Sequence, residues 1–207
     1  MRAAVKSPLL ENVSIDGARG VLIRFETSNP SLYERFHSGE KGDLEKRLGL
    51  IRYCRKLGYL IATGSLIGFP GQTEEDLLED ILLTKELGAE MYSFGPLIPH
   101  PDTPLGCQER PGIGMVLKVL AVSRLVDPEG KILVTTALET LDKDKGRRDG
   151  LLSGANSLMI NVTPKKYRDQ YSIYPGRPDK DKDIVRNIDE TIKLLHSIGR
   201  APTDLGV

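Results

Sequence analysis

Hydrophobic and polar positions follow two different periods along this chain from residue 21 onward. Short apolar runs, which are typical of buried strands, are followed by stretches in which apolar residues recur every three or four positions, as on one face of a helix. The runs predict strands at residues 21–26, 59–67, 91–98, 132–136 and 157–161. The longer periods predict helices at residues 43–57, 74–87, 114–126, 145–153 and 182–198.

The second expected helix has clear end signals. Thr73 can accept a hydrogen bond as its N-cap, acidic residues occupy its positive first turn, and Gly88 is placed to end it. We expect its buried stripe to consist of Leu77, Leu78, Ile81 and Leu82.

Strands that alternate with helices predict an α/β protein with a parallel sheet. Two architectures fit: an open doubly wound sheet, or part of an eight-unit barrel. The barrel would need three further strands, which residues 1–20 cannot supply. Spacing alone therefore favours the open sheet.

Composition excludes several classes of protein. The 29 basic and 29 acidic residues cancel, so the chain lacks the positive charge typical of nucleic-acid binding. No apolar run is long enough to span a membrane, and no secretory signal is evident, so we expect a cytoplasmic protein. The two cysteines, Cys54 and Cys107, form no zinc or redox motif, and the P-loop and G-x-S-x-G motifs are absent.

Unusual polar residues follow the expected strands, where both architectures bind ligands. Arg24 and Glu26 end the first strand, glycine-rich turns follow the second and third, and Thr135 and Thr136 end the fourth. Together they suggest a site for a polar, zwitterionic ligand. Alternatives remain at each position: a structural ion pair between Arg24 and Glu26, glycines that only shape turns, and threonines that only suit a strand.

Four segments also carry a family resemblance. They read LIRFETSNP (22–30), GSLIGFPGQT (64–73), GPLIPHPDTPL (95–105) and YRDQYSIYPG (167–176). In this order they resemble radical S-adenosylmethionine maturases of the [FeFe]-hydrogenase, in a group that includes biotin synthase. The resemblance implies a partial (β/α)8 TIM barrel whose five units correspond to strands 4 to 8, and it replaces the open sheet. It divides the chain into an irregular segment (1–20), the partial barrel (21–199) and a tail (200–207).

The resemblance also implies chemistry and site residues. Such enzymes use a [4Fe-4S] cluster to cleave S-adenosylmethionine into a 5′-deoxyadenosyl radical, here for assembly of the hydrogenase diiron cofactor. The residues matching the cofactor site are Glu26, Arg47 and Met91. The residues matching a cavity for an anionic substrate are Arg24, Thr135, Thr136, Tyr171 and Tyr174.

One departure from the family pattern is large. The C-x3-C-x2-C motif that ligates the cluster is not present in this sequence. We therefore expect no metal ligand or catalytic residue here, an inactive chain on its own, and as partners an N-terminal half of the barrel and hydrogenase maturation proteins. The alternatives are a biotin-synthase-like or methylornithine-synthase-like enzyme, and a non-catalytic or split-half binding module.

Overall fold

A parallel sheet forms the centre of the computed structural model, which describes residues 18–37, 43–168, 174–177 and 183–203. Its order, β1-β2-β4-β6-β7, follows the chain. The strands are β1 (Gly20–Leu22), β2 (Leu60–Thr63), β4 (Met91–Tyr92), β6 (Lys131–Val134) and β7 (Ser157–Leu158). Two more strands, β3 (Leu66–Ile67) and β5 (Gly95–Pro96), pair with each other in parallel.

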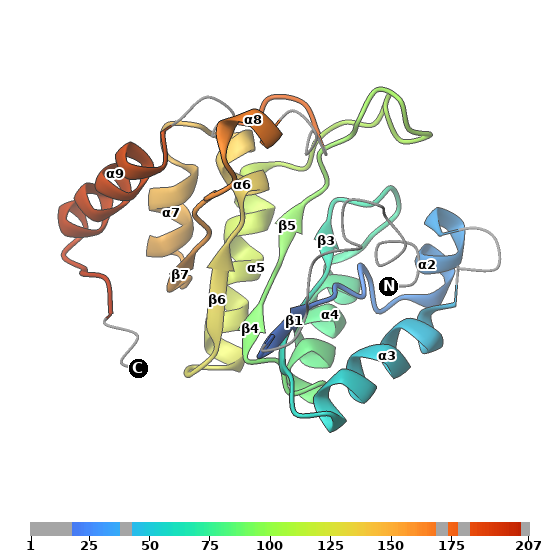
Figure 1. Ribbon diagram of the computed structural model, residues 1–207. Coiled ribbons are helices and arrows are strands. Elements are labelled where there is room, and N and C mark those ends of the chain that lie inside the picture. The colour runs from blue at the N-terminus through green and yellow to red at the C-terminus, as the bar shows by residue number, and fades with distance from the viewer. Residues whose placement is uncertain (1–17, 38–42, 169–173, 178–182, 204–207) are drawn as a thin grey trace.

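The strand order identifies the architecture. A doubly wound sheet reverses its order at a switch point and carries helices on both faces. Here the order never reverses, and α4 and α5 lie behind the sheet with α3 and α7 to its sides (Figure 1). This is the arrangement of consecutive barrel units, so the partial (β/α)8 barrel is confirmed and the open sheet favoured by spacing alone is wrong.

All five expected helices are present, and three short helices were not expected. The expected ones are α3 (Leu44–Lys56), α4 (Glu74–Glu86), α5 (Ile113–Val126), α7 (Gly146–Leu152) and α9 (Ile184–Ser197). The additional ones are α2 (Pro30–Phe36), α6 (Thr136–Leu141) and α8 (Lys165–Arg168). None of the three is long enough for a hydrophobic period to show.

All five expected strands end early or divide, and the first stops at Leu22, not at residue 26. The runs at 59–67 and 91–98 each form two strands, separated at Gly64 on the first. Gly64 has a φ of +154°, and a Cβ there would lie 2.5 Å from the carbonyl oxygen of Ser93, so only glycine permits this close approach. The strand expected to reach Thr136 stops at Val134, because Thr135 is the N-cap of α6 and accepts from the amide of Leu138 at 3.4 Å. The last strand ends at Leu158, not at residue 161.

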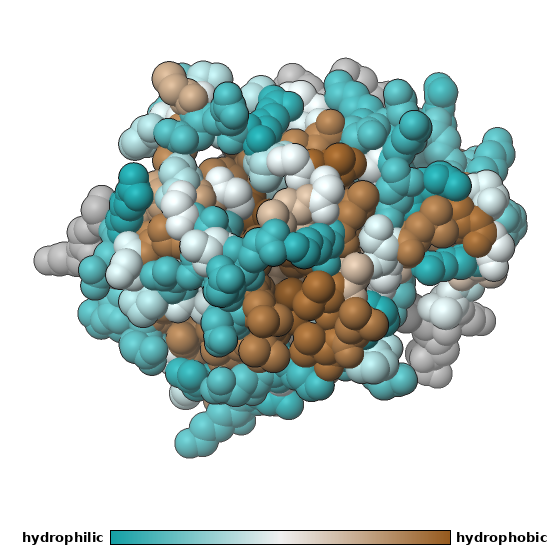
Figure 2. Space-filling view, turned by 180° about the vertical axis from the view of Figure 1, so that it is seen from behind, coloured by the Kyte–Doolittle hydropathy of each residue, from teal (hydrophilic) through white to brown (hydrophobic). Residues whose placement is uncertain are grey.

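The buried face of α4 differs from the expected stripe. Leu77 and Ile81 are buried, but Leu78 and Leu82 are 43% and 42% exposed. Hydrophobic side chains accordingly gather on the helix-covered side of the molecule (Figure 2), where Leu78 lines an apolar groove between α4 and α5. Asp80 and Thr84 occupy the buried face in their place.

Among the described residues, no helix is long and apolar enough to cross a membrane.

Candidate active site

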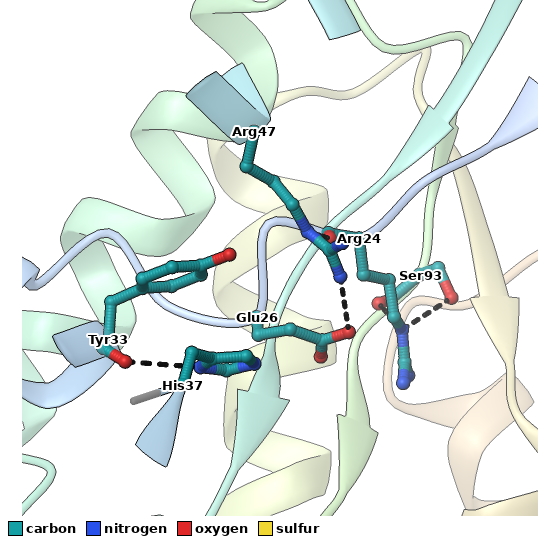
Figure 3. Close-up of polar contacts among 6 residues, drawn as sticks. All are labelled: Arg24, Glu26, Tyr33, His37, Arg47 and Ser93. Carbon is teal, nitrogen blue, oxygen red and sulfur yellow. Dashed lines mark hydrogen bonds and ion pairs between the residues drawn. The ribbon is translucent and has the colours of Figure 1, made fainter. Parts of the chain in front are cut away.

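Alternation along the first strand aims two charged side chains away from the helices. Phe25 is fully buried in the cluster that includes residues of α3. Because successive side chains of an extended segment point to opposite faces, Arg24 and Glu26 lie on the inner side of the sheet, at its carboxyl edge. Figure 3 shows both side chains near Arg47 of α3 and Ser93.

Glu26 is held in an unusual conformation. Its φ is +74°, and it is the one non-glycine residue with a positive φ in the described part of the chain. Its Oε1 lies 3.6 Å from the guanidinium of Arg47, which also donates to the carbonyl oxygen of Arg24 at 2.8 Å. Its Oε2 is buried and has no hydrogen-bond partner. A strained residue that presents an unsatisfied buried acceptor is typical of a ligand site.

Arg24 does not form the ion pair with Glu26 that was one alternative. Its Nε donates to the carbonyl oxygen and hydroxyl of Ser93, at 3.1 and 3.3 Å. A Cβ on Gly95 would lie 2.6 Å from the Arg24 guanidinium and 3.1 Å from Thr135 Oγ1, so the missing side chain makes room for both. Burial lowers the pKa of Arg24, while the neighbouring Glu26 and Tyr174 raise it.

The remaining predicted residues fall in three places. Thr136 begins α6, and its hydroxyl lies 3.0 Å from the phenol oxygen of Tyr174. Tyr171 lies outside the described residues. Met91 begins β4, two residues before Ser93, which places it about 7 Å lower along the strand. The structure thus groups Arg24, Glu26 and Arg47, and the role of Met91 stays a prediction.

Two aromatic rings border the Glu26 side of the site. Tyr33, on α2, is 2% exposed, and its ring stacks on His37 with the centroids 4.2 Å apart. Burial raises the pKa of the Tyr33 phenol, and the nearby Arg47 opposes this shift. Figure 3 shows both rings on the side of Glu26 that lies away from Arg24 and Ser93.

The charged side chains of the site fit one of the two cofactors that the family resemblance implies, S-adenosylmethionine. A carboxylate with a free oxygen beside a guanidinium matches the amino and carboxylate groups of a zwitterionic amino acid, as in S-adenosylmethionine. It does not fit an iron–sulfur cluster. Cys54 is buried in the core, Cys107 is exposed, and the described residues contain no group of three potential metal ligands.

Sequence patterns missed several residues of the site. Ser93 and Gly95 have no individual signal beyond their place in an apolar run. Asp80 does have one: it lies three residues after Leu77 and one before Ile81, on the face expected to be apolar. A carboxylate at such a position predicts a specific hydrogen-bond partner inside the protein.

Comparison with known proteins gives consistent results. The chain is 38% identical over 186 residues to the [FeFe] hydrogenase maturase subunit HydE of Thermotoga maritima, covering 90% of this chain and 53% of that protein. It is 27% identical over 189 residues to 3-methylornithine synthase of Methanosarcina acetivorans, covering 90% and 51%. It is also 31% identical over 118 residues to biotin synthase of Chlorobium phaeovibrioides, covering 56% and 34%. No family model matches the chain.

Solved structures show the same fold. Methylornithine synthase (PylB) superimposes with a TM-score of 0.71 at 22% identity, covering 91% of this chain and 53% of that one. HydG, a maturase of the [FeFe]-hydrogenase, superimposes with a TM-score of 0.56 at 19% identity, covering 67% and 32%. The chain therefore belongs to the biotin synthase-like group of radical S-adenosylmethionine proteins.

Within that group the chain is a relative of HydE, to which it is similar over nine-tenths of its own length. It spans about half the length of HydE and of 3-methylornithine synthase, which agrees with a partial barrel.

Proposed function

We propose that this chain forms the S-adenosylmethionine- and substrate-binding part of a radical S-adenosylmethionine enzyme that acts in assembly of the [FeFe]-hydrogenase diiron cofactor. The observation that carries the proposal is the Glu26 carboxylate, with one oxygen paired to Arg47 and the other buried without a partner. The similarity to HydE supports the choice within the group.

In this proposal the two charged ends of S-adenosylmethionine are bound by Glu26 and Arg47. The free Glu26 oxygen accepts a hydrogen bond from the amino group or a ribose hydroxyl, and the Arg47 guanidinium pairs with the carboxylate. Charge-assisted hydrogen bonds of this kind are about twice as strong as neutral ones. Tyr33 and His37 exclude water from one side of this contact.

The substrate would lie beside Arg24. The absence of a side chain at Gly95 makes room for the guanidinium itself, and Thr135 and the Thr136–Tyr174 pair add hydroxyl groups. A cation among hydroxyls suits an anionic compound such as an iron–carbonyl–cyanide precursor. Tyr171 is proposed to complete this cavity.

The radical chemistry itself needs groups that this chain does not contain. A bound [4Fe-4S] cluster would supply the electron that cleaves S-adenosylmethionine, and its ligands must come from residues outside this sequence. We therefore expect the chain alone to bind but not to cleave S-adenosylmethionine. The first and last strands of the described sheet, β1 and β7, each pair on one side only, so further barrel strands could add at either edge.

The test is S-adenosylmethionine binding by the 207-residue chain, measured by isothermal titration calorimetry. We expect Glu26→Gln to weaken binding at least tenfold, because an amide removes the charge that attracts the ammonium group. The matched control is Glu90→Gln, because Glu90 pairs with Arg55 at 3.3 Å at the opposite edge of the sheet. Binding that is equal in wild type and Glu26→Gln, or absent from the wild type at millimolar ligand, would overturn the proposal.

A further inference from the structure

A buried carboxylate on α4 contacts the segment that follows Glu26. Asp80 is fully buried, and its Oδ1 accepts from the backbone amide of Ser28 at 2.6 Å. One turn earlier, Asp76 Oδ1 accepts from the side-chain amide of Asn29 at 2.8 Å. Two acids on one helix thus hold consecutive residues of the same loop.

A second path leads from Asp80 back to Glu26. Asp80 Oδ2 lies 3.5 Å from Gln72 Nε2, which donates to the carbonyl oxygen of Leu66 at 3.0 Å. The amide of Leu66 in turn donates to the carbonyl oxygen of Glu26 at 2.9 Å. Asp80 is therefore connected by two routes to the backbone on the C-terminal side of the strained residue.

Strain explains why such connections would be needed. A non-glycine residue at positive φ costs about 1 kcal/mol or more and persists only where its surroundings hold it. The ion pair with Arg47 is partly exposed and 3.6 Å long, so it cannot supply this constraint alone. The hydrogen bond of Asp80 acts directly on the backbone of the loop, and that of Asp76 acts on the loop through the side chain of Asn29.

We propose that Asp80 is a positioning residue, which fixes the loop after Glu26 so that the free Glu26 oxygen faces the ligand, with Asp76 supporting it through Asn29. This inference rests on the proposed function for its ligand, but the geometry it describes exists without one.

The positioning role of Asp80 should depend on pH, because it depends on the charge of the carboxylate. Burial raises the pKa of Asp80 to about 6, the amide of Ser28 and the hydroxyl of Ser65 favour the ionised form, and the charge of Asp76 raises the pKa. The groups that face Asp80 from other elements, Ser28, Ser65 and Gln72, carry no charge. Ionised Asp80 is the stronger acceptor for the Ser28 amide, so positioning should improve as pH rises through about 6.

The experiment combines amide hydrogen exchange with S-adenosylmethionine affinity in Asp80→Asn. We expect exchange at the amides of Ser28 and Glu26 to accelerate at least tenfold, with little change at Ile81 on α4. We expect affinity to fall about tenfold at pH 7 and to lose its rise between pH 5 and 7. His37→Gln should keep that rise, which separates Asp80 from the histidine beside the site.

Asp127→Asn is the matched control. Asp127 accepts from the hydroxyl of Tyr92 at 2.9 Å, so this variant also removes the charge of a hydrogen-bonded acid, but one that does not contact the loop after Glu26. Should Asp80→Asn not fold, Asn29→Ser keeps a helix cap for α2 but cannot reach Asp76, and it should accelerate exchange at Ser28 by a smaller factor.

Each outcome separates the two proposals. Unchanged exchange at Ser28 and Glu26 in Asp80→Asn overturns the positioning role, whatever the affinity. Accelerated exchange throughout α4 also overturns it, because Asp80 would then only stabilise the helix. Localised acceleration with no Glu26-dependent binding in the wild type supports the positioning role and overturns the proposed ligand.

Discussion

At the amino edge of the sheet polar side chains pair with backbone amides, whereas at the carboxyl edge buried side-chain oxygen atoms, among them one of Glu26, have no hydrogen-bond partner. At the amino edge Glu90 accepts from the amide of Ile61 at 2.5 Å and pairs with Arg55, and Asn156 accepts from the amide of Ile132 at 2.8 Å. At the carboxyl edge Glu26 is strained and one of its oxygens has no partner. The amino edge therefore serves stability, whereas we propose that the carboxyl edge binds the ligand, as expected for a barrel.

The pKa values show the same contrast within one helix at the carboxyl edge. Burial raises the pKa of Asp76, but hydrogen bonds from Thr73 and Asn29 outweigh it and hold the pKa below its usual value. Three residues later, burial dominates and raises the pKa of Asp80 to about 6. Asp76 belongs to the helix cap, while Asp80 is buried where it accepts from the backbone amide of Ser28.

The largest effect should come from adding a side chain at Gly64, where the backbone after β2 passes close to Ser93. Gly64→Ala places a Cβ against the backbone of Ser93, so we expect a loss of about 4 kcal/mol in the free energy of unfolding. Gly49→Ala is the control, because nothing lies within 4 Å of its added Cβ and α3 should gain about 0.5–1 kcal/mol. Urea denaturation measures both. An unchanged stability of Gly64→Ala would show that the two strands can separate without cost.

A smaller effect concerns the pH dependence of stability. The folded pKa of Asp80, about 6, exceeds its ordinary value of 3.8, so the folded state keeps this proton to higher pH than the unfolded state. The contribution of Asp80 therefore decreases as pH rises from about 4 to 6, by on the order of 2–3 kcal/mol, and is constant above. We expect the difference in stability between wild type and Asp80→Asn to change by this amount between pH 4 and 7. A difference that does not vary with pH would place the Asp80 pKa near its ordinary value.

The smallest effect tests strain at Glu26. Glycine adopts positive φ without cost, so Glu26→Gly should be about 1 kcal/mol more stable than Glu26→Ala. At exposed Glu79, inside α4, the order should reverse by a similar amount, because glycine disfavours a helix. Thermal or urea unfolding of the four variants measures the comparison. If alanine is preferred at both positions, residue 26 is not strained in solution.

Local sequence patterns predicted much of the fold. Hydrophobic period and caps located five helices, and Thr73 is the N-cap of α4 as expected, in a capping box with Asp76. They missed α2, α6 and α8, and they joined strands that the structure divides, because a break such as the one at Gly64 depends on how closely another strand approaches. Barrel or open sheet could not be decided from spacing, since both require the same alternation.

The candidate site could likewise be predicted from the sequence only in part. By itself the sequence determined which charged residues end the strands, because the position of Arg24 and Glu26 after an apolar run places them at the ligand-binding edge. Only the tertiary structure decided their partners: Arg24 contacts Ser93, 69 positions away, and Glu26 pairs with Arg47 of α3. Residues distant in sequence meet only through strand register and packing. The unpaired oxygen of Glu26 and the hydrogen bonds of Asp80 could therefore be seen only in the folded chain.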